Sequence, residues 1–272
     1  MGLNLLVGYV GLISLGQAGL FAAGAYAAAL LATHVSHSMW LGLAAGILLA
    51  SLVAAVFALI SLRSPGVYFI LITLALSQLV WAVVFNWRSL TRGDDGIRGI
   101  GSPEIWYSVS LSGSAAYYYL ALLFFLLVLF VMWCIVRSPF GKAIVGIREN
   151  ESRMRHLGYD VWRHKFAAFM ISGAFSGLAG VLWAYYAGYV SPADASFSVS
   201  VEALLIVILG GGSLLGPVVG TMVVVIIKNV IGAYTGRWLL VMGVAYVLCV
   251  LFTPKGIVSA FSVRLKRRTG GL

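Results

Sequence analysis

Four stretches of about twenty residues without a charged side chain constrain this sequence most. They are residues 40–62, 66–85, 115–136 and 166–186. The hydrocarbon core of a bilayer is roughly 30 Å thick, and an apolar helix of about 20 residues crosses it. Charged residues make up 10% of the chain, whereas a soluble domain typically has about 25%. The sequence therefore predicts an all-α, polytopic transmembrane protein and excludes a soluble enzyme and a nucleic-acid-binding domain.

Glycines interrupt two further apolar stretches. Residues 3–33 are too long for one straight span and contain Gly-Leu-Ile-Ser-Leu-Gly at 11–16. Residues 201–231 are broken at 210–213 (Gly-Gly-Gly-Ser) and at 216–217 (Gly-Pro). Non-helical backbone at membrane depth is tolerated only where protein or a water-filled cavity covers it. Both breaks are therefore candidates for the wall of a translocation path.

The placement of positive charge predicts the orientation. Much of the basic excess lies in residues 137–165 and in the tail, residues 257–272, beside apolar runs. Loops of this kind are cytoplasmic under the positive-inside rule. The loop at 88–114, which carries three basic and three acidic residues, is expected to be extracytoplasmic. With a last span at 238–252, we expect a single transmembrane domain over residues 1–256.

The span count is open between about seven and eight. If residues 201–231 cross the membrane once, the basic tail is outside, against the positive-inside rule. If these residues cross twice as two short segments, the tail is inside. We prefer the cytoplasmic tail. Small residues four apart, Gly42/Gly46 and Gly173/Gly177, further predict close helix packing.

Patterns that bind ATP or metal were also considered. The sequence has no Gly-x-x-x-x-Gly-Lys-Ser/Thr loop, and His34 and His37 lack a further ligand. Charges inside the membrane usually mark ion pathways, but the polar residues within the apolar stretches are neutral. They are Asn4, Ser14, Gln17, Thr73, Ser77, Gln78, Ser172 and Ser176. Such residues suit a zwitterion or an uncharged solute, and helix–helix hydrogen bonds would explain most of them.

The basic loop contains a candidate partner-binding element. Residues 142–156 can form a short charged helix, and Gly158 is a plausible C-cap. A charged helix between two spans fits a groove on a soluble partner. The alternative is an interfacial helix that lies on anionic lipid.

Several motifs resemble those of one family. The run LNLLVGYVGLISLGQA at 3–18 resembles the opening motif of permeases from branched-chain amino acid ATP-binding-cassette (ABC) importers of the LivM type. Residues 143–158, 166–180, 208–220 and 252–256 resemble later motifs of that family, in the same order.

Two departures accompany this resemblance. Family members usually have one or two further spans before the opening motif, on which this sequence almost begins. Gln17 stands where a histidine is common in the family, and this change bears on the solute.

The resemblance implies a multi-pass permease of the bacterial cytoplasmic (inner) membrane. A second homologous permease would pair with it, two ABC ATPase subunits would bind ATP and Mg²⁺, and an extracytoplasmic solute-binding protein would deliver the solute. The chain itself then needs no cofactor. The implied solutes are leucine, isoleucine and valine, or a related small polar molecule.

The resemblance also assigns residues to two roles. The ATPase-coupling helix would include Arg148, Glu149, Asn150, Leu157 and Gly158. The translocation path and its hinges would include Gly8, Gly11, Ser14, Gly16, Gln17, Gly210, Gly211, Gly212 and Pro217.

Two other function classes fit the composition. A stand-alone channel or facilitator for a small neutral solute, such as urea or an amide, would also have charge-free spans. A secondary transporter would be built from inverted repeats, and the sequence has no clear internal repeat. Buried carboxylates for ion coupling are also missing from the four uncharged spans.

Overall fold

The computed structural model describes residues 1–35, 38–101, 114–234 and 243. Within this part of the chain, four helices are long and apolar enough to cross a membrane. They are α3 (Met39–Ser61), α4 (Val67–Asn86), α6 (Ser114–Arg137) and α9 (Val161–Ala187). These helices coincide with the four uncharged stretches, so the predicted spans are confirmed. Apart from residue 243, the predicted last span lies outside the described residues, as does the basic tail.

The first interrupted stretch consists of helical pieces joined by irregular backbone. Its elements are α1 (Gly2–Asn4), the π-helix η1 (Leu5–Val10), non-helical residues 11–16 and α2 (Gln17–His34). Gly11 ends η1 in the left-handed conformation, with φ of 82°, which glycine adopts at little cost. The predicted interruption at 11–16 is therefore confirmed.

Residues 2–17 form a hairpin. Gly2 and Gln17 lie at the same height along α9, since both contact Ser172 of that helix. A β-carbon at Gly2 would lie 2.7 Å from the Ser172 carbonyl oxygen, and the Gln17 side chain donates to the Ser172 hydroxyl. Between them, Gly11 packs against the side chain of Arg148. The chain therefore runs from the middle of the bundle toward one end, turns near Gly11, and returns to begin α2.

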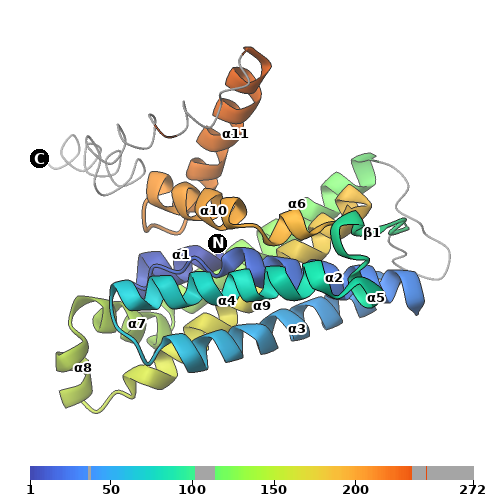
Figure 1. Ribbon diagram of the computed structural model, residues 1–272. Helices are drawn as coiled ribbons and strands as arrows, with labels where there is room; N and C mark the ends of the chain where they lie inside the picture. The colour runs from blue at the N-terminus through green and yellow to red at the C-terminus, as the bar shows by residue number, and fades with distance from the viewer. Residues whose placement is uncertain (36–37, 102–113, 235–242, 244–272) are drawn as a thin grey trace, which may run out of the picture.

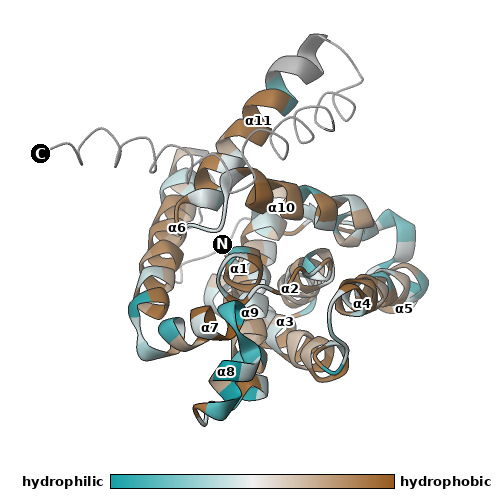
Figure 2. Cartoon of the chain, turned by 90° about the vertical axis from the view of Figure 1, so that its left-hand side faces the viewer, coloured by the Kyte–Doolittle hydropathy of each residue, from teal (hydrophilic) through white to brown (hydrophobic). Residues whose placement is uncertain are grey.

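The second interrupted stretch also divides as predicted. α10 (Phe197–Gly210) and α11 (Gly216–Tyr234) are separated by residues 211–215. α10 lies over α1 and α2, whereas α11 projects away from the bundle (Figures 1 and 2). Glu202 of α10 and Lys228 of α11 approach to 3.4 Å.

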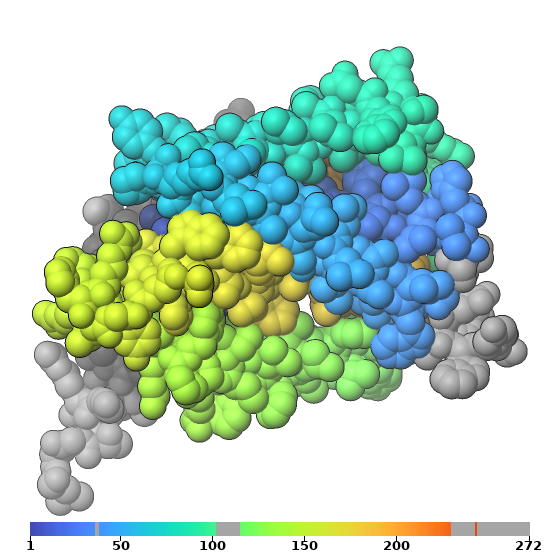
Figure 3. Space-filling view, turned by 90° about the horizontal axis from the view of Figure 1, so that it is seen from below, coloured from blue at the N-terminus to red at the C-terminus, as the bar shows by residue number. Residues whose placement is uncertain are grey.

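Small residues bring α2, α3 and α9 together at the centre of the molecule. A β-carbon at Gly24 of α2 would lie 2.5 Å from Gly177 Cα of α9, and one at Gly46 of α3 would overlap Val181 of α9. The expected close packing at the two glycine pairs is therefore confirmed. Figure 3 shows α3 and α9 side by side, with α4 beyond α3 and α6 beyond α9.

The connecting segments gather at two opposite ends of the bundle (Figure 1). One end holds the α3–α4 turn, α7 (Pro139–Glu149) and α8 (Glu151–His156). The other end holds α5 (Arg88–Thr91), η2 (Gly93–Asp95), η3 (Pro192–Ala195) and a two-stranded antiparallel pair. Its strands are β1 (Ile97–Arg98) and β2 (Tyr189–Val190), with Ile97 opposite Val190. The basic loop and residues 88–101 are thus at opposite ends, as the orientation requires.

The expected single helix over residues 142–156 is corrected to two helices. Asn150 has extended backbone between α7 and α8 (φ −157°, ψ 99°), and its side-chain oxygen accepts a hydrogen bond of 2.9 Å from the Arg153 N–H. Asparagine favours this N-cap arrangement because its side chain satisfies a free N–H at the helix start. α8 therefore begins as a separate helix.

Gly158 ends α8 as the sequence predicted. Its φ is 85°, its N–H donates to the Arg155 carbonyl (3.0 Å), and the Tyr159 N–H donates to the Met154 carbonyl (3.1 Å). This pair of bonds is the Schellman motif of helix C-termini.

We predict that Gly46→Leu destabilises the protein by about 1–3 kcal/mol, because the added side chain has no space between α3 and α9. Ala44→Leu is the matched control, since Ala44 is exposed on the same helix. Thermal unfolding in detergent micelles would compare the two variants. Equal melting temperatures would contradict this account of the packing.

Candidate translocation and coupling site

The helix η1 contacts the α10–α11 break inside the protein. A β-carbon at Gly8 would lie 3.0 Å from Gly212 Cα and 2.6 Å from Asn4 Oδ1. Beside this contact, Asn4 Nδ2 donates a 2.9 Å hydrogen bond to the carbonyl of Ser213, which is 209 residues away in sequence. Two backbones approach this closely only because neither glycine has a side chain. The hairpin and the α10–α11 break therefore form one structural unit.

The N-terminus of α2 lies within the bundle, and its free N–H groups need partners. The first N–H groups of a helix have no partner within the helix, and hydroxyl side chains from other helices supply partners here. The pairs are Ala18–Ser200 (3.1 Å) and Gly19–Ser77 (3.0 Å), and Leu15, which precedes the helix, donates to Thr73 in the same way (3.2 Å). These bonds explain why α4, an otherwise apolar span, contains Thr73 and Ser77.

Gln17 is buried and bonded at both ends of its amide to α9. Its Nε2 donates to Ser172 Oγ (3.0 Å), and its Oε1 accepts from Ser176 Oγ (2.5 Å). The predicted helix–helix hydrogen bonds of these neutral residues are therefore confirmed.

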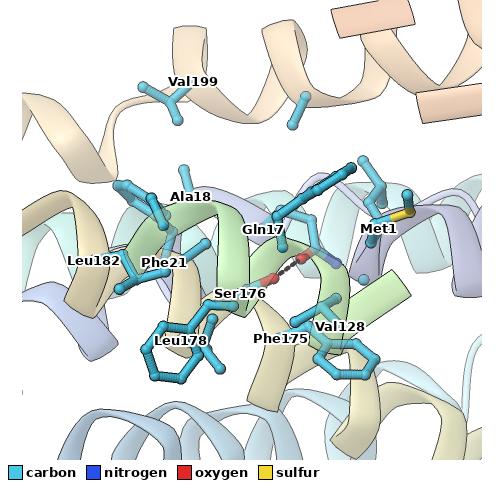
Figure 4. Close-up of a pocket in the computed structure, with 17 residues that line it drawn as sticks. Met1, Gln17, Ala18, Phe21, Val128, Phe175, Ser176, Leu178, Leu182 and Val199 are labelled. Carbon is cyan, nitrogen blue, oxygen red and sulfur yellow. Dashed lines mark hydrogen bonds between the residues drawn. The ribbon is translucent and has the colours of Figure 1, made fainter. Parts of the chain in front are cut away.

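An apolar cavity of about 340 Å³ lies beside this amide, between the hairpin, α2, α6, α9 and α10. Figure 4 shows Phe21, Leu178 and Val199 among its lining residues. Within that lining, Gln17 and Ser176 supply the polar side-chain groups, since the others are apolar or glycine. The cavity can hold an aliphatic group with a hydrogen-bonding group at its wall.

Arg148 connects the basic loop to the hairpin. It lies at the end of α7, and its Nη1 donates a hydrogen bond to the Gly8 carbonyl. Gly8 is near the C-terminal end of η1, where carbonyls lack helical partners and a positive charge is favourable. The aliphatic part of the same side chain packs on Gly11, where a β-carbon would lie 2.9 Å from Arg148 Cγ.

Ion pairs hold α8 against the start of α9. Glu151 contacts both Lys165 Nζ and Arg155 Nη2 at 2.6 Å. Burial disfavours the charged form of Glu151, but the hydrogen bonds and charges of Lys165 and Arg155 outweigh this effect and lower its pKa. Glu151 is therefore ionised at neutral pH and bridges α8 and α9.

The other residues that the sequence assigned to the translocation path lie in or beside the non-helical backbone of the two breaks. Ser14 Oγ accepts from the Gly16 N–H (3.1 Å). Gly211 has φ of 86° and ψ of 162°, a conformation that is essentially restricted to glycine. Gly210 packs against the backbone of Gly216, immediately before Pro217. The structure thus brings Gly8, Gly212 and their neighbours together.

The residues assigned to coupling have different environments. Arg148 contacts the hairpin, whereas Asn150 caps α8, Leu157 is 66% exposed and Gly158 ends the helix. Glu149 is exposed at the end of α7. Ser200 and the Ser213 carbonyl were missed as partners, because hydroxyl and backbone groups in an apolar run give no signal of what they bind.

Together these features define a class of protein. In the described residues, four spans, a hairpin and a broken helix pair make a multi-pass membrane protein whose irregular backbone lies inside the bundle. Transporters use discontinuous helices of this kind at their binding sites.

The comparison with known families identifies the group to which this chain belongs. Residues 1–253 match the family described as the branched-chain amino acid transport system permease component, so the chain belongs to that family of transport permeases. No solved structure matches it.

Individual relatives carry more specific names. The high-affinity branched-chain amino acid transport system permease protein LivM of Escherichia coli is 32% identical over 99% of this chain and 69% of its own length. A probable branched-chain amino acid transport permease protein LivM of Methanocaldococcus jannaschii is 26% identical over 78% and 65%. The autoinducer 2 import system permease protein LsrC of Photorhabdus laumondii is 26% identical over 66% and 48%.

Gly211→Val is expected to impair transport strongly, because valine in this backbone conformation costs roughly 1–3 kcal/mol and shifts the α10–α11 break. Leu215→Val is the control within the same break, at an exposed position. Initial rates of solute uptake at matched membrane levels would measure the effect. Similar rates in the two variants would refute a role for this backbone in the path.

Proposed function

We propose that this chain is a permease subunit of an ABC importer in the inner membrane of a bacterium. It would pair with a second related permease, two ATPase subunits that bind ATP and Mg²⁺, and an extracytoplasmic solute-binding protein. The contact between Arg148 and the Gly8 carbonyl supports this proposal most directly, because it joins the basic loop to the hairpin within a single side chain. Family membership supports the same role.

The transported solute is proposed to be leucine, isoleucine or valine, or a related small polar molecule. The apolar cavity beside Gln17 suits an aliphatic side chain, and the uncharged lining suits a molecule without net charge. Relatives named for branched-chain amino acids support the first choice. A relative named for autoinducer 2 import is the reason to retain the broader class.

The mechanism is a shift between two populated conformations. The ATPases supply the energy through ATP binding and hydrolysis. In this chain, movement of α8 displaces α7 and Arg148, and Arg148 displaces the hairpin to which it is bonded. Displacement of the hairpin separates Gly8 from Gly212 and opens the path along the two breaks.

The ATPase-docking surface is proposed at the end of α8. Leu157 is a large apolar side chain that is 66% exposed, and Arg153, Arg155 and His156 precede it. Figure 2, which views the molecule from this end, shows α8 as predominantly hydrophilic. A partner that covers Leu157 would bury an apolar side chain, and the surrounding charged residues would form the polar rim of the interface.

Leu157→Asp is expected to reduce capture of the ATPase subunits by at least about tenfold, since it places a charge in an apolar contact. Ser152→Asp adds the same charge to an exposed position of the same helix and should retain more binding. The measurement is co-purification from membranes in mild detergent. If Leu157→Asp captures the ATPases normally, α8 does not dock through this residue.

Arg148→Ala, alone or with Glu149→Ala, should preserve insertion and ATPase capture but abolish most ATP-driven uptake, because the hairpin loses its link to α7. Arg163→Ala is the control, since Arg163 is exposed on the same loop and, among the described residues, its ion pair is with nearby Asp160. Uptake and ATP hydrolysis would be measured together in proteoliposomes. Solute entry through the permease without ATPases would instead indicate a facilitator.

A further inference from the structure

A second cavity, distinct from the apolar one beside Gln17, lies at the end of the bundle that holds α7 and α8. Its volume is about 450 Å³. The α3–α4 turn (62–66) and the hairpin tip (10–12) form part of its wall, and α7, α8 and the first turns of α9 complete it. The cavity therefore lies where the spans α3, α4 and α9 leave the membrane.

The wall of this cavity has a large positive charge. Its charged lining residues are Arg63, Arg148, Arg155, Lys165 and Glu151. Glu151 alone is acidic, and it is already bonded to Arg155 and Lys165. In the described part of the chain, Arg63 forms no ion pair. The charged side chains of the cavity thus have a net charge of about three positive units. They repel one another and attract an anion.

The N-terminus of α4 adds uncharged donors to the same wall. Gly66, the N-cap residue, has φ of 64°, and no side chain of the described residues caps this helix. Gly66 and Phe69 both line the cavity, and a β-carbon at Gly66 would contact nothing within 4 Å. The free N–H groups and the positive end of the helix dipole therefore favour an anion at the point where the basic side chains gather.

We propose that this cavity binds the phosphodiester headgroup of an anionic phospholipid. Basic pockets between transmembrane helices on the cytoplasmic side are suited to such headgroups. The residues beside the cavity support lipid rather than a protein carboxylate: Tyr68 is 70% exposed next to the α4 start, and Trp162 is 44% exposed at the α9 start. Tyrosine and tryptophan are enriched at the membrane–water boundary.

Binding of this lipid requires that the chain is a membrane protein, but it does not require that the chain transports a solute. The bound phosphodiester would contact the α3–α4 turn, α8 and the side chain of Arg148, which also holds the hairpin. An anionic lipid would thus stabilise the arrangement of the hairpin tip at this end of the protein.

The test measures lipid binding by the full-length chain, purified and stripped of lipid in a non-ionic detergent. Phosphatidylglycerol and phosphatidylcholine would be titrated separately, and bound lipid counted by native mass spectrometry. Arg63→Gln and Arg155→Gln should each weaken phosphatidylglycerol binding about fivefold. Lys142→Gln, an exposed position of α7 outside the cavity, should bind as the unchanged protein does, and Arg63→Lys should retain binding.

Several results would overturn the proposal. One is equal binding of phosphatidylglycerol by the Arg63→Gln/Arg155→Gln double variant and the unchanged protein. Equal affinity for phosphatidylcholine would show that the anion is not recognised, and displacement by an equal concentration of inorganic phosphate would indicate a soluble ligand. If the double variant keeps its lipid but loses the ATPases, the cavity binds a partner carboxylate. None of these assays measures uptake. A failure of the transport proposal would instead be detected by the measurements of uptake and ATP hydrolysis in proteoliposomes.

Discussion

Backbone groups that leave a helix inside a membrane must find partners in the protein, because the hydrocarbon core contains no water to bind them. This requirement explains several polar residues of the bundle. Hydroxyls of Ser77 and Ser200 accept from the first N–H groups of α2, and Asn4 donates to the Ser213 carbonyl. Arg148, which lies outside the membrane-spanning helices, donates to the Gly8 carbonyl. The hairpin and the first turn of α2 are therefore bonded to partners from four other segments, namely α4, α7, α10 and the α10–α11 break.

The glycines make these bonds geometrically accessible. Gly24 and Gly177 let α2 and α9 approach backbone to backbone, and the same approach recurs between Gly8 and Gly212. Without an aqueous phase to drive helices together, close packing and hydrogen bonds supply the association. The contact between Gly8 and Gly212 differs from the contacts between spans, because it joins η1 to the non-helical backbone of the α10–α11 break. In the proposed mechanism, this contact separates when the path opens.

The end of the bundle near α7 and α8 combines three proposed tasks. Leu157 is available to a soluble partner, Arg148 contacts the hairpin, and Arg63 faces a basic cavity. Glu151 bridges α8 and α9, since it binds Lys165 of α9 as well as Arg155 of its own helix. Met154 of α8 packs with Ala143 and Ile147 of α7, so in the proposed mechanism a movement of α8 reaches Arg148 and the hairpin through α7. The proposed lipid would sit beside the same contacts.

The sequence by itself determined the elements whose signals are local. Twenty uncharged residues predict a span, Gly11–Gly16 predicts a break, and Gly158 predicts the end of a helix, because length, backbone freedom and capping act between near neighbours. One local signal was misread: Asn150 begins a new helix, since its side chain caps the Arg153 N–H. Only the tertiary structure decided which distant groups meet. The Asn4–Ser213 bond and the Arg148–Gly8 bond join residues 209 and 140 positions apart. The acceptor in both bonds is a backbone carbonyl, and every residue has one. Only the packing of the helices therefore selects the partner.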